Sequence, residues 1–314
     1  MQHSSWGVQG KADIHVHTKY SGVHRLGVVR FPESVSNPAD VVLKARSVGM
    51  NVLCITDHNS TAGAMKAKAE SKDVKDIEVV VGEEISTADG EVIGLFLNEE
   101  IPAGLSIEES IDRIRAQDGL VIAPHPFSLH CPALGERIEG LDLDGIEVLN
   151  GGHRDEYANA KAAEVGKSGK WAKMGGSDAH YLPVVGSAYT TFNGSTAEEL
   201  RREILAKRTD GAGEVIPMDK AIAWSMTVIV HSDALILRSF LDLDRDKRDD
   251  PIVNKVYAMK LGQKLGALVG SFVYLLPPVP FLAGMASEKL FHRWAAQVEA
   301  GIDRIGKLGP FLLP

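Results

Sequence analysis

Residues 12–18 read ADIHVHT, and two histidines, His15 and His17, stand one residue apart behind a short apolar lead-in. Side chains alternate faces along a β-strand, so these two imidazoles would point the same way. Taken alone, the pair is more typical of the solvated side of an ordinary strand than of a metal site. The positions of the other histidines and carboxylates decide between these two interpretations.

The stretch is the first of several short apolar runs that continue to about residue 210. The runs are rich in Val and Ile and end in polar residues or glycine, which is typical of buried strands. They are ADIHVH, NVLCITD, IEVVVGEEI, EVIGLFL, GLVIAPH, GIEVLN and KWAKMGGSD. Helices are predicted over 37–49, 106–119 and 195–208, the first from an early proline and a final glycine and the others from Ser or Thr caps followed by Glu. This alternation predicts an α/β fold with parallel strands and crossover helices.

Residues able to bind a metal fall where these runs end. The carboxyl ends of parallel strands share one face of the molecule, so we expect the side chains of six separate segments to meet there. They are His15, His17, Asp57, His58, Glu83, Glu84, His125, Glu147, Asn150, His153, Asp178 and His180. Nitrogen and carboxylate ligands without thiolate suit Zn²⁺, Mn²⁺ or Fe²⁺. Their number exceeds what one ion needs, so the sequence predicts two or three divalent ions.

The composition is that of a globular domain without a disulfide framework. Of the 314 residues, 44% are hydrophobic and 24% charged, and the net charge of −8 disfavours bulk attraction to nucleic acid. The two cysteines, Cys54 and Cys131, suit a reducing compartment. The amino-terminal residues lack a basic start followed by an apolar stretch, so no signal peptide is expected and a cytoplasmic location is predicted.

Six motifs, in order, resemble the PHP (polymerase and histidinol phosphatase) family of metal-dependent phosphoesterases. They are HVHT, ITDHNSTAG, GEEIST, APHPF, EVLNG and GGSDAH. The resemblance runs from about residue 11 to 210 and includes SDAHYLPVVGSAYTTF, which is similar to the PHP-associated segment of many stand-alone members. It implies a distorted (β/α)7 barrel with a multinuclear metal centre at the carboxyl ends of its strands.

The resemblance assigns ligands to the first two ions. They are His15, His17 and Asp178 for the first ion, His125 for the second, and Glu84 as the carboxylate that bridges them. The family motif puts this glutamate directly before the isoleucine of GEEIS, so Glu83 is expected to face the other way, as adjacent strand residues do. A further ligand of the second ion is expected at Asn150 or His153.

A third ion is implied by His58 and His180. Without that ion, these two histidines would hydrogen-bond the phosphate and protonate the leaving group, and Asp57 would orient its neighbours. The sequence departs from the three-ion pattern at Ser21, where such members often carry a histidine. The sequence therefore leaves open whether the centre binds two ions or three.

The expected reaction is hydrolysis of a phosphate ester. A hydroxide bridging the first two ions would attack phosphorus, and Arg154, just after EVLNGG, is the best candidate among the basic residues for binding the phosphate. The substrate would be a small metabolite or a nucleotide. The alternatives are a 3'-5' or 5'-3' exonuclease on short oligonucleotides, disfavoured by the acidic balance, and a membrane-tethered metal-binding scaffold without turnover.

The motifs stop near residue 215, so we expect a phosphoesterase domain over 1–215 and a mainly helical, apolar region over 216–314. Two stretches of this region, 221–237 and 265–286, are apolar enough to suggest membrane contact at the inner face of the membrane. Pro277, Pro278 and Pro280 disfavour a single straight span. Packing of the same stretches on the barrel or on a partner subunit is the alternative, and the oligomeric state is left open.

Overall fold

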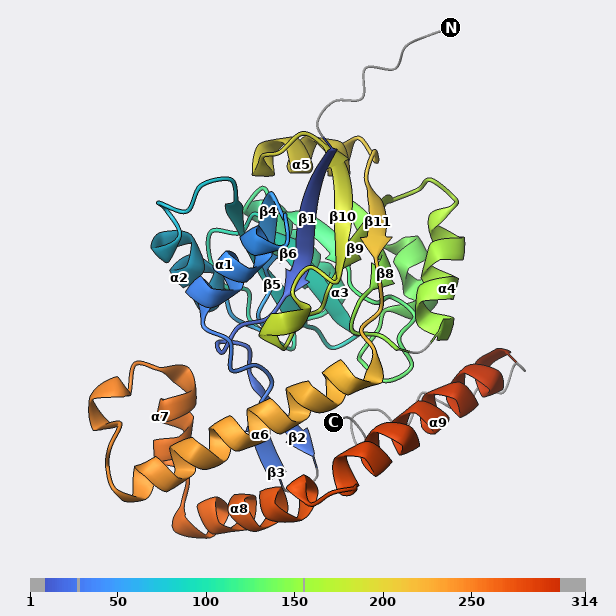
Figure 1. Cartoon of the computed structure of the whole chain (residues 1–314). Helices are drawn as coiled ribbons and strands as arrows, with labels where there is room; N and C mark the ends of the chain where they lie inside the picture. The colour runs from blue at the N-terminus through green and yellow to red at the C-terminus, as the bar shows by residue number, and fades with distance from the viewer. Residues whose placement is uncertain (1–8, 27–28, 155, 300–314) are drawn as a thin grey trace, which may run out of the picture.

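A computed structural model describes residues 9–26, 29–154 and 156–299. Nine strands form one nearly closed sheet (Figure 1). In the order in which they lie side by side they are β11 (Asp210–Gly213), β10 (Ala188–Asn193), β1 (Gln9–Val16), β4 (Val52–Ile55), β5 (Glu78–Ser86), β6 (Glu91–Leu95), β7 (Leu120–Ala123), β8 (Gly145–Asn150) and β9 (Ala172–Gly176). The predicted α/β barrel is therefore confirmed.

The sheet curls until its two ends meet. The Thr190 hydroxyl of β10 accepts a hydrogen bond from the Gly175 amide of β9 and donates one to the Gly175 carbonyl. Beyond β9, the Asp178 amide donates to the His15 carbonyl at 2.8 Å and the His17 amide to the Ala179 carbonyl at 3.1 Å. Barrel closure thus brings the segment after β9 against the end of β1.

The expectation that every strand is parallel is wrong for β6. This strand pairs antiparallel with both β5 and β7. Only residues 87–90 separate β5 from β6, which is enough for a hairpin turn and too short for a crossover helix. Strands β10 and β11 also run antiparallel to their neighbours.

Four helices pack around the barrel and a fifth covers one end of it. They are α1 (Pro38–Ser47), α2 (Ala62–Glu70), α3 (Ile107–Ala116), α4 (Glu156–Gly166) and α5 (Ala197–Leu205). The three predicted helices correspond to α1, α3 and α5. Ser106 caps α3 by accepting a hydrogen bond from the Glu109 amide, and Thr196 and Glu199 form a capping box at α5.

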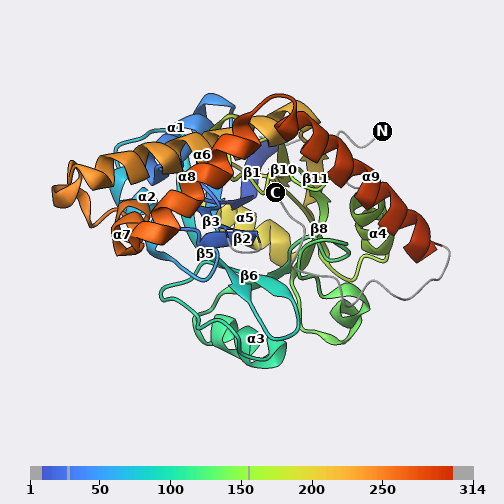
Figure 2. The same ribbon diagram turned by 90° about the horizontal axis from the view of Figure 1, so that it is seen from below.

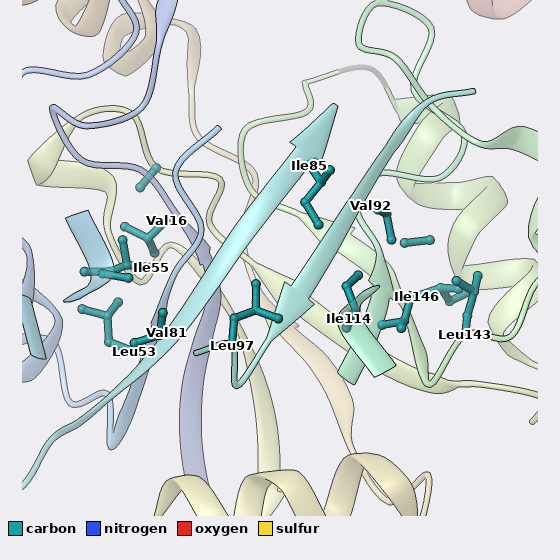
Figure 3. Packing of buried hydrophobic residues seen from close by; sticks show 14 of the residues in the cluster. Val16, Leu53, Ile55, Val81, Ile85, Val92, Leu97, Ile114, Leu143 and Ile146 are labelled. Atoms are coloured by element: carbon teal, nitrogen blue, oxygen red, sulfur yellow. The ribbon is translucent and has the colours of Figure 1, made fainter. Parts of the chain in front are cut away.

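Two apolar layers hold these elements together. One lies between the strands and the surrounding helices, where Val81 and Ile85 of β5 share a buried cluster with Ile114 of α3 (Figure 3). The other contains Ile14 of β1 and Leu200 of α5. Helix α5 lies at the end of the barrel where β1 begins, so the carboxyl ends of β1 and its parallel neighbours open on the opposite side (Figure 1).

The remaining helices form a layer beside that opposite end (Figures 1 and 2). We call them the helical layer: α6 (Met218–Phe240), α7 (Pro251–Ala258), α8 (Leu261–Leu275) and α9 (Val279–Glu299). A short hairpin of β2 (Val23–Leu26) and β3 (Val29–Pro32) extends from the barrel toward this layer. By length and composition α6 could cross a membrane, and so could α8 and α9 taken together, although they are bent by 81°.

Candidate metal centre

Two buried histidines, His15 in β1 and His17 directly after it, face a group of carboxylates. His15 Nδ1 lies 3.0 Å from Glu147 Oε1, and His15 Nε2 lies 3.1 Å from Glu84 Oε2. His17 Nε2 lies 3.2 Å from Asp178 Oδ1. The two imidazoles therefore point to one place, as their spacing on the strand predicts.

Glu84 is the carboxylate that joins the neighbouring groups of the centre. Besides His15, it approaches His58 Nδ1 at 3.2 Å and His125 Nε2 at 3.1 Å. Burial alone would raise the pKa of Glu84, but the imidazoles of His58 and His15 hold it well below its usual value. Glu83 faces away as expected, and its carboxylate accepts a hydrogen bond from the Ile101 amide.

Asp178 and His125 reach the centre from backbone conformations that are rare for residues other than glycine. Their φ angles are +50° and +26°, respectively. Such strain persists only where the surrounding structure imposes it, and it is concentrated at functional sites. For Asp178 the hydrogen bond from its amide to the His15 carbonyl provides that constraint.

Two further imidazoles, those of His58 and His180, lie beside His17. The rings of His17 and His180 stack with centroids 4.0 Å apart, and those of His17 and His58 with centroids 4.7 Å apart. The structure thus brings together all seven histidines and carboxylates that the resemblance names as ligands. Four overlapping sets within them and Glu91 have ligand atoms within 4.8 Å of one another: His17–His58–His180, His15–Glu84–His125, His15–His17–Asp178 and His58–Glu84–Glu91.

Two other predicted residues, Asp57 and Asn150, lie at the edge of this cluster. The Asp57 carboxylate accepts hydrogen bonds from the Thr18 amide and hydroxyl, so it holds the loop after β1. The Asn150 side chain donates to Glu147 and Asp178 and accepts from the His153 amide. These contacts orient the carboxylates, and the role of each residue toward an ion stays a prediction.

His153 stacks on His125, with ring centroids 4.7 Å apart. It forms a separate set of possible ligands with His130 and Cys131. Its Nε2 lies 2.8 Å from the Ser128 hydroxyl and its Nδ1 lies 3.0 Å from Asn150 Oδ1. Both ring nitrogens therefore already have partners within the protein.

Two glutamates that are absent from the predicted ligands, Glu33 and Glu91, also lie at the centre. Glu91 Oε1 is 3.6 Å from His58 Nδ1 and its Oε2 is 3.8 Å from His125 Nε2. The signal for Glu91 was the turn TADG between two apolar runs, which predicts a hairpin and places Glu91 opposite Ser86 at the end of β5. Glu33 follows β3 and lies 3.4 Å from His58 Nε2. No local pattern in the sequence indicated it.

The donor set fits divalent cations. Within the described part of the chain, every ion pair of Glu84 and Asp178 is with a histidine, and none is with Lys or Arg. His125 Nδ1 is buried and makes no hydrogen bond to any described residue. Buried carboxylates of this density require positive charge close by, and buried nitrogen atoms require a partner. Divalent ions among these groups would supply both.

The helical layer reaches the rim of the centre at several points. The ring of Trp224 on α6 lies 5.7 Å from that of His180, and Phe291 on α9 stacks on His130 at 4.6 Å. At the start of α7, Asp250 pairs with Lys19, which follows shortly after His17. The layer therefore forms part of the surroundings of the centre.

Comparisons with known proteins identify the family of the chain. The PHP domain family model matches residues 13–117, and the PHP-associated model matches residues 156–209. An uncharacterized protein of Methanocaldococcus jannaschii is 52% identical over 149 residues, which cover 48% of this chain and 86% of that protein. A 5'-3' exoribonuclease of Haemophilus influenzae is 29% identical over 116 residues, 36% of this chain and 38% of that protein.

Among solved structures, a two-domain protein of Bacteroides vulgatus, described as containing a predicted PHP-like metal-dependent phosphoesterase, has a similar fold. The TM-score is 0.54 at 16% identity, and the match covers 67% of this chain and 66% of that one. At this identity the similarity concerns the fold alone. The matched family models, together with the 52% identical relative, show that the chain belongs to the PHP family.

Proposed function

We propose that this protein is a divalent-metal-dependent phosphoesterase that hydrolyses a phosphate ester of a small metabolite or nucleotide. The observation that carries the proposal is the meeting of His15, His17, Glu84, His125 and Asp178 at the carboxyl ends of the barrel strands. Bound divalent ions would lower the pKa of a water molecule and neutralise charge on the phosphoryl oxygens.

The residues of the chain would position the ester. Arg154 is half-buried, and its Nη1 is buried without a hydrogen bond to any described residue. Burial lowers the pKa of this guanidinium, and Glu288 opposes that shift. A guanidinium with an unused donor suits a phosphate oxygen. The leaving oxygen needs either a proton from His180 or His58, or a cation held by them.

Two neighbouring glutamates provide a matched test of the proposal. Glu84→Gln should lower turnover of a phosphomonoester in the presence of Mn²⁺ by about a hundredfold or more, because the charge that joins the ligand groups is lost. Burial raises the pKa of Glu83 to about 8, so this carboxyl is largely protonated at neutral pH. Glu83→Gln should therefore retain turnover. Equal activity of the two variants would count against the proposal.

Nuclease activity is the second candidate, and the similarity to the exoribonuclease of Haemophilus influenzae favours it. Comparing AMP with an end-labelled trinucleotide at equal concentrations separates the two activities. We expect faster phosphate release from the monoester. Stepwise shortening of the trinucleotide with AMP left intact would instead support the exonuclease.

We also infer that the helical layer contacts an anionic membrane surface. Large apolar side chains recur at helical spacing on α8 and continue onto α9, and all are at least 45% exposed. This α8–α9 face consists of Leu261, Leu265, Val269, Phe272, Leu276, Phe281, Leu282 and Met285. Residues 261–287 contain no acidic residue, and the exposed Lys260, Lys289 and Arg293 flank them. On a chain of net charge −8, an apolar face bordered by cations suits anionic lipid.

The proposed location is therefore the inner face of the cytoplasmic membrane. The two cysteines, Cys54 and Cys131, are free thiols, which suits a reducing compartment.

A further inference from the structure

Ser21 stands beside the group formed by His17, His58 and His180, and its hydroxyl is already engaged. It lies 2.9 Å from His17 Nδ1 and accepts a hydrogen bond from the His58 amide at 3.0 Å. Ser21 is buried, and its hydroxyl contacts the imidazole of His17 and the backbone of His58. A cation held by His58 and His180 would need a further ligand, and a neutral hydroxyl with these bonds adds no charge.

The carboxylate of Glu33, directly after β3, occupies the neighbouring position. Glu33 Oε2 lies 3.4 Å from His58 Nε2, 4.0 Å from His180 Nε2 and 3.5 Å from the Ser21 hydroxyl. Its side chain is 16% exposed. The Glu33 carboxylate therefore lies at Nε2 of His58, whereas Glu84 lies at Nδ1 of the same ring.

We propose that Glu33 is the carboxylate ligand of a third divalent-cation site, with His58 and His180, and replaces the ligand that Ser21 does not supply. The inference rests on the proposed metal-dependent function and adds a ligand to the same centre. One carboxylate and two imidazoles suit Mn²⁺, Zn²⁺ or Fe²⁺. A cation held by these residues would stabilise negative charge on a leaving oxygen, the role otherwise given to a proton from His180.

Helix α6 holds this ligand in place. The indole Nε1 of Trp224 donates a 2.8 Å hydrogen bond to the backbone carbonyl of Glu33, and the same ring lies against His180. Trp224 therefore contacts two of the three ligands without offering a donor atom to the cation, which makes it a positioning residue. Lys255 of α7 interacts electrostatically with Glu33, so the carboxylate has a countercharge before a cation binds.

The test measures the number of cations bound per chain and does not depend on turnover. The full chain is stripped with a chelator and re-equilibrated with Mn²⁺, and bound manganese per chain is measured by mass spectrometry and by calorimetric titration. Glu33→Gln should bind one equivalent fewer than the wild type, and the first equivalents should keep their affinity. Trp224→Phe should keep the stoichiometry but weaken the last equivalent about tenfold, as loss of a residue that supports a ligand does. Glu83→Gln is the control and should match the wild type.

Circular dichroism confirms that each variant is folded before its cations are counted. Equal stoichiometry in Glu33→Gln and the wild type overturns the proposal, whatever the turnover. Loss of one equivalent supports it even if no phosphate ester is hydrolysed. That combination would contradict the proposed function but not the third site. Loss of all equivalents in Glu33→Gln also overturns it, because Glu33 would then support the whole centre.

Discussion

Glu84 lies between 3.1 and 3.4 Å from four imidazole rings, whereas its neighbour Glu83 accepts a backbone hydrogen bond on the other face of β5. Their surroundings shift the pKa values of the two carboxyl groups in opposite directions. Imidazoles outweigh the effect of burial at Glu84 and keep it ionised, while burial dominates at Glu83 and raises its pKa to about 8. Alternation along one strand therefore places a charged ligand and a largely neutral core residue side by side.

The histidines around Glu84 make cation binding depend on pH. Burial would lower the pKa of His58 and of His125, but Glu84 and the other carboxylates raise them to about 10 and about 9 in the cation-free protein. A cation binds only the neutral imidazole, so at pH 7 it must displace these protons. We expect the apparent Mn²⁺ affinity to rise between pH 6 and 8, about tenfold per pH unit for each proton displaced.

Calorimetric titrations in two buffers of different ionisation enthalpy count the released protons. Binding should release at least one proton at pH 7 and fewer at pH 9.5, where the His125 imidazole is already largely neutral. Affinity that stays constant from pH 6 to 8, with no proton release, would show that these histidines are neutral before the cation arrives.

At the scale of elements, periodicity and caps predicted most of the barrel. The seven apolar runs correspond to β1 and β4–β9, and helices α1, α3 and α5 begin within two residues of their predicted starts. The direction of a strand, and the approach of residues that are far apart in the sequence, could not be predicted in the same way. Strand β6 runs antiparallel to β5 because the two are joined by a short turn. This antiparallel pairing brings Glu91 to the centre. Glu33 follows the β2–β3 hairpin, and its backbone carbonyl accepts a hydrogen bond from Trp224 of α6, about 190 residues later in the chain.

Helix α2 approaches the loop after β1 so closely that only glycine fits at its second residue. A Cβ atom built at Gly63 would lie 1.9 Å from Asp57 Oδ2 and 2.4 Å from the Thr18 hydroxyl. Gly63→Ala must therefore break the hydrogen bonds between the buried Asp57 and Thr18, and should lower the free energy of unfolding by about 2–4 kcal/mol. Urea unfolding measures this. Gly140→Ala, where a Cβ meets nothing within 4 Å, is the control, and an equal effect of both substitutions would contradict the prediction.

Considered as a whole, the molecule places its helical layer against the rim of the centre. Trp224 of α6, Asp250 at the start of α7 and Phe291 of α9 each contact a residue near the ligands. The sequence showed that the character of the chain changes near residue 215, but these contacts depend on tertiary packing that no local pattern encodes. Membrane contact through the same layer would hold the mouth of the barrel near the lipid surface.

Contact of the α8–α9 face with lipid should be measurable by flotation. In a flotation assay with vesicles of phosphatidylcholine and phosphatidylglycerol, the full chain should float with the lipid, and less of it should float at high salt because Lys260, Lys289 and Arg293 contribute electrostatically. Val269 and Phe272 are each 66% exposed on the α8–α9 face. Replacing both with Glu removes two apolar contacts, about 3 kcal/mol or more in total, and should reduce binding more than a hundredfold. Leu43→Glu is the matched control, since Leu43 is 51% exposed on α1 of the barrel, and it should bind as the wild type does. If the wild type fails to float and instead forms a dimer that the double substitution dissociates, the face is an interface between two copies of the chain and the membrane proposal is wrong.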